Sequence, residues 1–82
     1  MDTLITVKAK YLQLSRAVEA KEEEFVMDPS SHYRELLEAV RKRHPSLTYI
    51  PMIAIIDGRP ADPDTKVKDK DEVDFIASPV GG

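Results

Sequence analysis

The 82-residue sequence contains no cysteine, which excludes disulfide bonds, thiolate metal sites and cysteine nucleophiles. It has only three glycines: Gly58 lies inside the chain, while Gly81 and Gly82 are its last two residues. A glycine-rich loop that binds phosphate through backbone amides therefore cannot form. A chain of this length has room for one core and little volume for a deep pocket, so we expect function at the surface or at the ends.

Charge and hydropathy exclude two classes of partner. Twelve basic and 15 acidic side chains give a net charge of −3, which argues against the basic surface of a nucleic-acid-binding protein. No apolar run approaches the roughly 18 to 20 residues of a membrane span, and the first residues do not resemble a signal peptide. We therefore predict a cytoplasmic protein without nucleic-acid or membrane partners.

The candidate metal ligands do not have the spacing of a metal site. The aspartates in residues 62–64 and 69–72 lack the central glycine and the final glutamate of a calcium loop. His32 and His44 stand twelve positions apart, about 18 Å along an ideal helix, and cannot share a metal. We predict no metal site, and we place both histidines at the surface near the ends of a helix.

Apolar periodicity predicts a strand, a weak strand and a helix in the first half of the chain. Residues 1–11 alternate as in a half-buried strand, and residues 22–27 form either a short strand or a charged loop end. Residues 12–21 fit neither period well, although Leu14, Ala17 and Val18 could form one helical turn. Asp28 and Pro29 predict the start of the helix. Its apolar stripe comprises Tyr33, Leu36, Leu37 and Val40.

The second half predicts strands separated by turns. The apolar residues 52–56 indicate a strand that is buried on both faces. Asp57 and Gly58 indicate a turn, after which Arg59 begins a short return strand. Residues 73–77 form a last strand, with Val73, Phe75 and Ala77 on one face.

This order of elements predicts an α+β fold. One helix cannot cover both faces of a sheet, so we expect a mixed sheet with one main helix packed across one face. An opening pair of strands, a crossing helix and a last strand beside the first describe the β-grasp, or ubiquitin-like, topology. We assign residues 1–78 to this domain and residues 79–82 to a flexible C-terminal Gly-Gly tail.

The tail is the strongest candidate for a functional segment. Gly81 and Gly82 have no side chains, so this end can enter a narrow channel and approach a partner's backbone closely. Residues 77–82 reach about 20 Å when fully extended, and Pro79 would stiffen the base of the tail. The alternative is a frayed or appended chain end without function.

Motifs from residue 53 to the end carry a family resemblance. Residues 67–73 are similar to a Leu-x-Asp-Gly-Asp-Glu-Val signature, except that Lys70 stands where glycine is usual. Phe75 and the ending Pro79-Val80-Gly81-Gly82 complete the pattern. The chain resembles the MoaD/ThiS family of ubiquitin-like sulfur carriers, most closely the small subunit of molybdopterin synthase (MoaD-like).

The resemblance implies a protein cosubstrate, not an enzyme that acts by itself. An E1-like adenylyltransferase would use ATP and Mg²⁺, which this chain does not itself bind, to adenylate the Gly82 carboxylate. A sulfur donor protein would then displace AMP and leave a C-terminal thiocarboxylate. Pro79, Val80 and Gly81 would insert into the large subunit of molybdopterin synthase, where the sulfur passes to a precursor of the molybdenum cofactor. An exposed sheet face around Phe75 would bind both enzymes in turn.

Two alternatives remain open at this stage. In one, Gly82 forms an isopeptide with lysines, as in the small archaeal ubiquitin-like modifiers, or carries sulfur for tRNA or thiazole. In the other, the chain is a non-conjugating interaction domain, for which Gly81 and Gly82 would be irrelevant.

Overall fold

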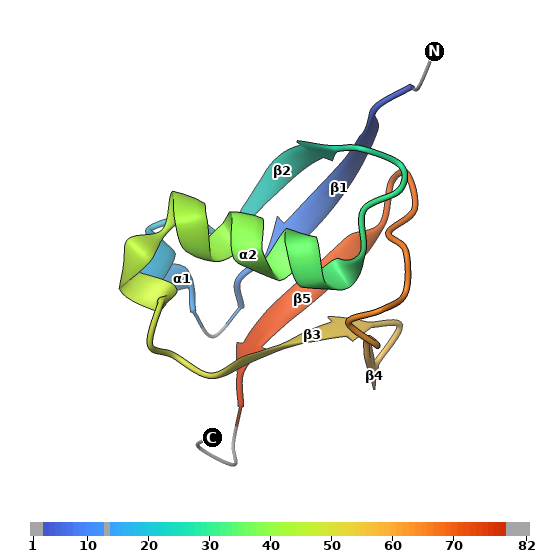
Figure 1. Cartoon of the computed structure of the whole chain (residues 1–82). Coiled ribbons are helices and arrows are strands. Elements are labelled where there is room, and N and C mark those ends of the chain that lie inside the picture. The colour runs from blue at the N-terminus through green and yellow to red at the C-terminus, as the bar shows by residue number, and fades with distance from the viewer. Residues whose placement is uncertain (1–2, 13, 79–82) are drawn as a thin grey trace.

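A computed structural model describes residues 3–12 and 14–78 of the chain, so the predicted tail, residues 79–82, lies outside the described residues. The chain folds into one sheet with one long helix lying across it (Figure 1). The elements are β1 (Ile5–Lys10), α1 (Ser15–Val18), β2 (Glu22–Met27), α2 (Tyr33–Arg43), the 3-10 helix η1 (Pro45–Leu47), β3 (Met52–Ile56), β4 (Arg59–Pro60) and β5 (Glu72–Ala77).

The sheet has the predicted mixed topology. Its strand order is β2-β1-β5-β3-β4, so the first and the last strands are neighbours in its centre. β1 and β5 are parallel, whereas the pairs β1–β2, β3–β5 and β3–β4 are antiparallel. The last strand therefore lies beside the first, as the element order predicts.

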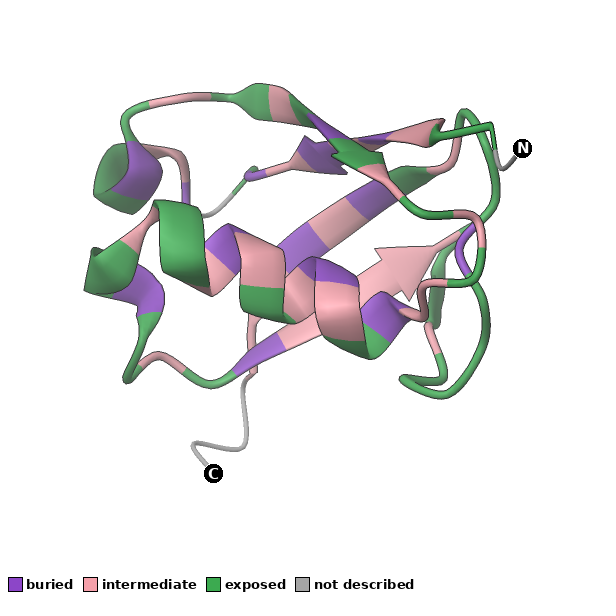
Figure 2. Cartoon of the chain, turned by 45° about the horizontal axis from the view of Figure 1, so that its top comes forward, coloured by how far each residue is buried: buried purple, intermediate pink, exposed green. Residues whose placement is uncertain are grey.

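The core lies between the sheet and α2. The alternation of β1 directs Val7 and Ala9 toward the helix, and both are fully buried. Leu36 and Val40 of α2 meet them from the other side (Figure 2). Leu14 and Val18 extend this core from α1, the short helix that forms in the segment where no period was evident. The predicted apolar faces of β1 and α2 are thus confirmed.

The helix starts later than predicted. α2 begins at Tyr33, with His32 at its N-cap, because the side chain of Asp28 folds back and accepts bonds from the backbone and hydroxyl of Ser30. Asp28 thus stabilises a turn ahead of the helix. The first helical amides are occupied by a distant loop: Tyr33 N–H donates to the carbonyl of Thr65, and Arg34 N–H to that of Pro63.

β3 is not buried on both faces, which corrects the sequence-based expectation. Only Met52 is buried, and the other four residues of the strand are partly exposed. The apolar run suggested two covered faces, but α2 covers only one of them. Ile53 and Ile55 therefore lie on the uncovered face of the sheet.

Two turns place residues in the left-handed region. Asp57 (φ 52°) and Gly58 (φ 78°) form the predicted two-residue turn between β3 and β4, in which both positions need positive φ. Lys70 also has positive φ (68°), at the position where the resemblance has glycine. Its backbone N–H donates to the carbonyl of Thr6 in β1 at 2.7 Å, and this hydrogen bond holds Lys70 in the left-handed conformation.

We predict that Lys70→Gly raises the free energy of unfolding by about 0.5 to 1 kcal/mol, because glycine removes the steric cost of positive φ, which exceeds the entropy glycine adds to the unfolded chain. Urea unfolding measures the change. Lys68→Gly is the matched control: Lys68 is also exposed but is not among the residues with positive φ, so that variant should lose stability. A Lys70→Gly variant less stable than the native chain would contradict the argument.

Candidate docking face and tail root

The face of the sheet opposite α2 carries no covering element among the described residues, and we call it the open face. Pairing and alternation place two kinds of side chain on it. Near the end of β5 it is apolar, and toward the start of β5 and along β1 and β2 it is charged. The apolar patch comprises Ile53, Ile55 and Ile76.

The apolar patch adjoins the point where the tail leaves the domain. Ile76 pairs directly with Ile53 across β5 and β3. Two residues further on, Ser78 N–H donates to the carbonyl of Pro51 at 2.8 Å, which extends the same ladder by one step. Tyr49, 95% exposed, precedes Pro51 in the chain. We call Ser78, Pro51 and Tyr49 the tail root.

The shortness of the tail constrains any enzyme that receives it. Residues 79–82 span at most about 14 Å beyond Ser78 at 3.3 to 3.6 Å per residue. Any partner group that contacts Gly82 must therefore lie within that distance of the tail root. The apolar patch is the surface that adjoins the tail root.

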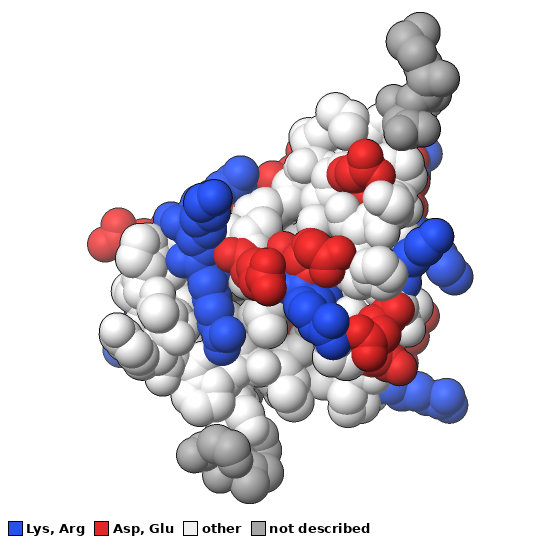
Figure 3. Space-filling view, viewed as in Figure 1, with Lys and Arg blue, Asp and Glu red and all other residues white. Residues whose placement is uncertain are grey.

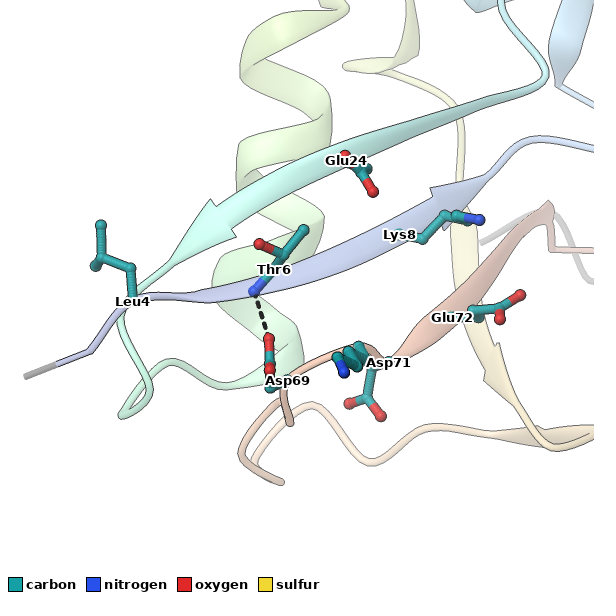
Figure 4. A pocket seen from close by; sticks show the side chains of 8 residues that line it. Leu4, Thr6, Lys8, Glu24, Asp69, Asp71 and Glu72 are labelled. Atoms are coloured by element: carbon teal, nitrogen blue, oxygen red, sulfur yellow. Dashed lines mark hydrogen bonds between the residues drawn. The ribbon is translucent and has the colours of Figure 1, made fainter.

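The other half of the open face is polar and carries both signs of charge. Lys10 meets Glu72 at 2.5 Å and Lys8 meets Glu22 at 3.8 Å. The hydrogen bond with Glu72 raises the pKa of Lys10, and that with Lys10 lowers the pKa of Glu72. A hollow of about 570 Å³ lies at this end, where Thr6 N–H donates to Asp69 at 2.9 Å (Figure 4). Its mixed charges do not form an anion or a cation site.

Phe75 does not lie on the open face, and this prediction is wrong. Its side chain is fully buried and faces α2, with its ring centroid 6.3 Å from that of Tyr11. The sequence pattern grouped Phe75 with Val73 and Ala77, but it did not show that this is the face covered by α2. The neighbouring residue, Ile76, occupies the exposed position instead.

A buried polar cluster at the end of α2 was not expected. Tyr11 O–H donates to Glu23 Oε1 at 2.8 Å, and His44 Nε2 lies 2.6 Å from the same oxygen. His44, expected at the surface, is only 15% exposed. Burial and the bond to Glu23 raise the pKa of Tyr11. The cluster fastens β2 and α2 to the end of β1, and we assign it a structural role.

The described residues were also compared with the requirements of a metal site and of a membrane-spanning helix. In residues 3–12 and 14–78, no group of three or more histidine, aspartate and glutamate side chains could hold a metal ion. None of the helices in this part of the chain is long and apolar enough to cross a membrane. The predicted reactive residue, Gly82, and the predicted inserting residues, Pro79, Val80 and Gly81, all lie outside the described residues.

The fold is that of the ubiquitin-like β-grasp proteins. A protein from Pyrococcus furiosus described as molybdopterin converting factor, subunit 1, is similar with a TM-score of 0.82 and 24% identity, over 89% of this chain and 97% of that one. Small archaeal modifier protein 1 gives TM-scores of 0.78 for Haloferax volcanii (16% identity; 94% of this chain, 99% of that one) and 0.77 for Methanosarcina acetivorans (19%; 98% and 99%).

The sequence gives a more specific assignment. Residues 9–82 match the model of the ThiS family, so the chain belongs to that family. The match extends through Gly81 and Gly82. No curated protein matches the sequence.

We predict that Glu23→Gln lowers the free energy of unfolding by about 1 to 2 kcal/mol at neutral pH, because it weakens charge-assisted hydrogen bonds. Burial tends to raise the pKa of Glu23, but bonds with His44 and Tyr11 hold it below its usual value of 4.5. The carboxylate therefore stabilises the fold fully above about pH 4.5, and this contribution is lost as pH falls through the folded pKa.

Urea unfolding between pH 7 and pH 3 checks this dependence. The native chain and the Glu23→Gln variant should converge in stability as the pH falls. Glu24→Gln is the control, because it makes the same change at the exposed neighbour. The free energy of unfolding of this variant should change with pH in parallel with that of the native chain. A constant difference between native and Glu23→Gln across the range would exclude the proposed linkage.

Proposed function

We propose that this protein is a sulfur carrier whose reactive group is the carboxylate of Gly82. The observation that carries the proposal is the family match, which runs from residue 9 to Gly82 and so includes the diglycine end. The apolar patch adjoins the tail root, so an enzyme that acts on the terminus could dock where the chain leaves the domain.

The chemistry requires activation by a second protein. A carboxylate is a poor electrophile, because its negative charge repels nucleophiles and neither oxygen is a good leaving group. An E1-like adenylyltransferase would join an oxygen of Gly82 to the α-phosphorus of ATP, with Mg²⁺, and release pyrophosphate. Hydrosulfide released by a donor protein would then attack the acyl carbon, forming the C–S bond as the bond to AMP breaks, and the thiol proton would be lost to leave the thiocarboxylate. This chain contributes the acyl group and the surface that positions it.

The apolar patch is the surface that we assign to docking. Ile53, Ile55 and Ile76 are partly exposed on one face, and the short tail requires contact close to them. Apolar residues that become fully desolvated contribute most of the binding energy of an interface. Because the activating and the receiving enzymes would both need this surface, they would bind in turn.

For the acceptor, we propose the role of small subunit of molybdopterin synthase. In that role the tail enters the large subunit and its sulfur passes to a pterin precursor of the molybdenum cofactor. The similarity to the Pyrococcus furiosus converting factor subunit supports this assignment. Modification of lysines and sulfur transfer to tRNA or thiazole use the same first step, so the acceptor is tested separately.

We predict that deletion of Gly82 abolishes thiocarboxylate formation while the stability of the domain stays unchanged. Intact mass spectrometry after incubation with the activating enzyme, ATP, Mg²⁺ and a sulfur source shows whether sulfur has replaced one terminal oxygen. A loaded deletion variant, or an unloaded full-length chain, would refute the carrier mechanism. Diglycine remnants on lysines of other proteins would instead identify a modifier.

We predict that Ile76→Asp slows loading of Gly82 by at least about tenfold, which corresponds to 1.4 kcal/mol of lost binding free energy. The aspartate places a charge in the centre of the apolar patch, where docking would desolvate it. Loading rates at subsaturating carrier concentration measure the loss.

Val26→Asp is the matched control for this experiment. Val26 is 64% exposed on the same face but belongs to β2, the strand at the edge of the sheet away from β3. It should load at the native rate, and urea unfolding should show that both variants are folded. Equal loading by Ile76→Asp and the native chain would exclude the apolar patch as the docking surface.

A further inference from the structure

β2 forms an edge of the sheet with an outward-facing backbone. The Tyr11 N–H donates to the carbonyl of Lys21 at 2.8 Å, so the alternation of an antiparallel ladder directs the backbone of Glu23 and Phe25 toward β1. The peptide groups of Glu24 and Val26 then face away from the sheet. Such an edge can accept a further strand.

A hollow of about 380 Å³ runs along this edge, between β2 and the second half of α2. Figure 1 shows the two elements lying alongside each other. We call this hollow the edge groove, and its lining is Phe25, Val26, Ala39, Lys42 and Arg43. Its apolar residues can contact an aliphatic side chain, and its cationic residues stand on the helix side.

The edge groove is electropositive on its helix wall. Arg41, Lys42 and Arg43 form the last turn of α2, and Figure 3 shows Lys and Arg side chains gathered over this part of the surface. Within residues 3–12 and 14–78, Lys42 has no ion-pair partner. Arg43 lies over the ring of Phe25 at 4.1 Å and remains 48% exposed.

The glutamates of β2 leave the cationic wall largely uncompensated. Glu22 projects to the open face, where it meets Lys8 at 3.8 Å. Glu23 is engaged by His44 at 2.6 Å and lies 4.0 Å from Arg43. Glu24 lines the polar hollow on the open face.

The hydrogen bond that the outward-facing backbone of β2 makes within the chain is weak. Arg43 donates to the outward carbonyl of Glu24 at 3.4 Å, which is the outer limit of a hydrogen bond. An incoming backbone N–H could replace this bond with a shorter one and leave the guanidinium free to meet a carboxylate. A second copy of this chain is a poor occupant, because antiparallel pairing of two β2 strands would bring their glutamate runs together.

We propose that the edge groove binds an extended segment of a partner protein in which an acidic residue stands two positions from an aliphatic one, so that both side chains lie on the same face of the segment. The segment adds to β2 as a sixth strand. Its aliphatic side chain lies over Phe25 and Ala39, and its carboxylate meets Lys42 and Arg43. In the sheet order, β1 separates β2 from β5, whose end leads to Ser78 of the tail root, so a partner could hold the domain here while the tail is inside an active site.

Nuclear magnetic resonance titration of the full ¹⁵N-labelled chain tests the proposal without any sulfur chemistry. The probe is a capped hexapeptide of threonines with valine at the second position and aspartate at the fourth, so that valine and aspartate share one face of the strand. Saturable shifts are expected at the amides of Glu24, Val26, Ala39 and Lys42, with slower hydrogen exchange at Glu24 and Val26. The outcome is independent of whether Gly82 is ever loaded.

Matched changes in peptide and protein separate the components of binding. Lysine in place of aspartate should weaken binding at least about tenfold, and proline in the peptide centre should abolish it by removing a backbone donor. Lys42→Glu should weaken binding of the acidic peptide about as strongly, whereas Lys66→Glu, the same charge change near the start of α2, should not. The backbone of Lys66 forms an isolated antiparallel β-bridge with that of His32, and Lys66 is exposed.

Three results would overturn the proposal. The first is the absence of a saturable shift up to the solubility limit of the peptide. The second is a set of shifts confined to Ile53 and Ile76, which would place the peptide on the apolar patch. The third is equal binding of the aspartate and the lysine peptides, which would remove the charge complementarity on which the inference rests.

Discussion

The parallel pairing of β1 with β5 is the interaction on which the rest of the structure depends. It joins the first and last strands in the centre of the sheet, and the tight connection at Lys70 and Asp71 holds their register. The antiparallel pairing of β5 with β3 on its other side then places the end of β5 beside the start of β3. The tail therefore leaves the domain beside Pro51, next to Ile53 and Ile76, and not at an arbitrary point of the surface.

The second constraint is that one helix covers only one face. α2 buries the larger apolar set, which includes Phe75, and leaves the smaller set of isoleucines partly exposed. In the proposed carrier role, this uncovered face is the surface that enzymes acting on the tail would contact. The edge groove lies at the opposite border of the sheet, so two partners need not compete.

Prediction from sequence succeeded where local patterns carry the information. The alternation in β1, the stripe of α2 and the Asp57-Gly58 turn all appear where expected, because each depends on neighbours in the chain. Prediction from sequence failed where contacts between distant segments determine the structure. The start of α2 moved to Tyr33 because residues 63–65 cap its first amides, and His44 is partly buried because Glu23 and Tyr11 meet it from two other elements.

The sequence by itself determined the α+β order, the absence of cysteine chemistry and the diglycine end that marks the chain as a carrier candidate. Only the tertiary structure decided which side chains are available to partners. Adjacent residues of a strand point to opposite faces, so Phe75 and Ile76 exchange roles according to which face the helix covers. That choice depends on packing between segments forty residues apart, and no local pattern in the chain records it.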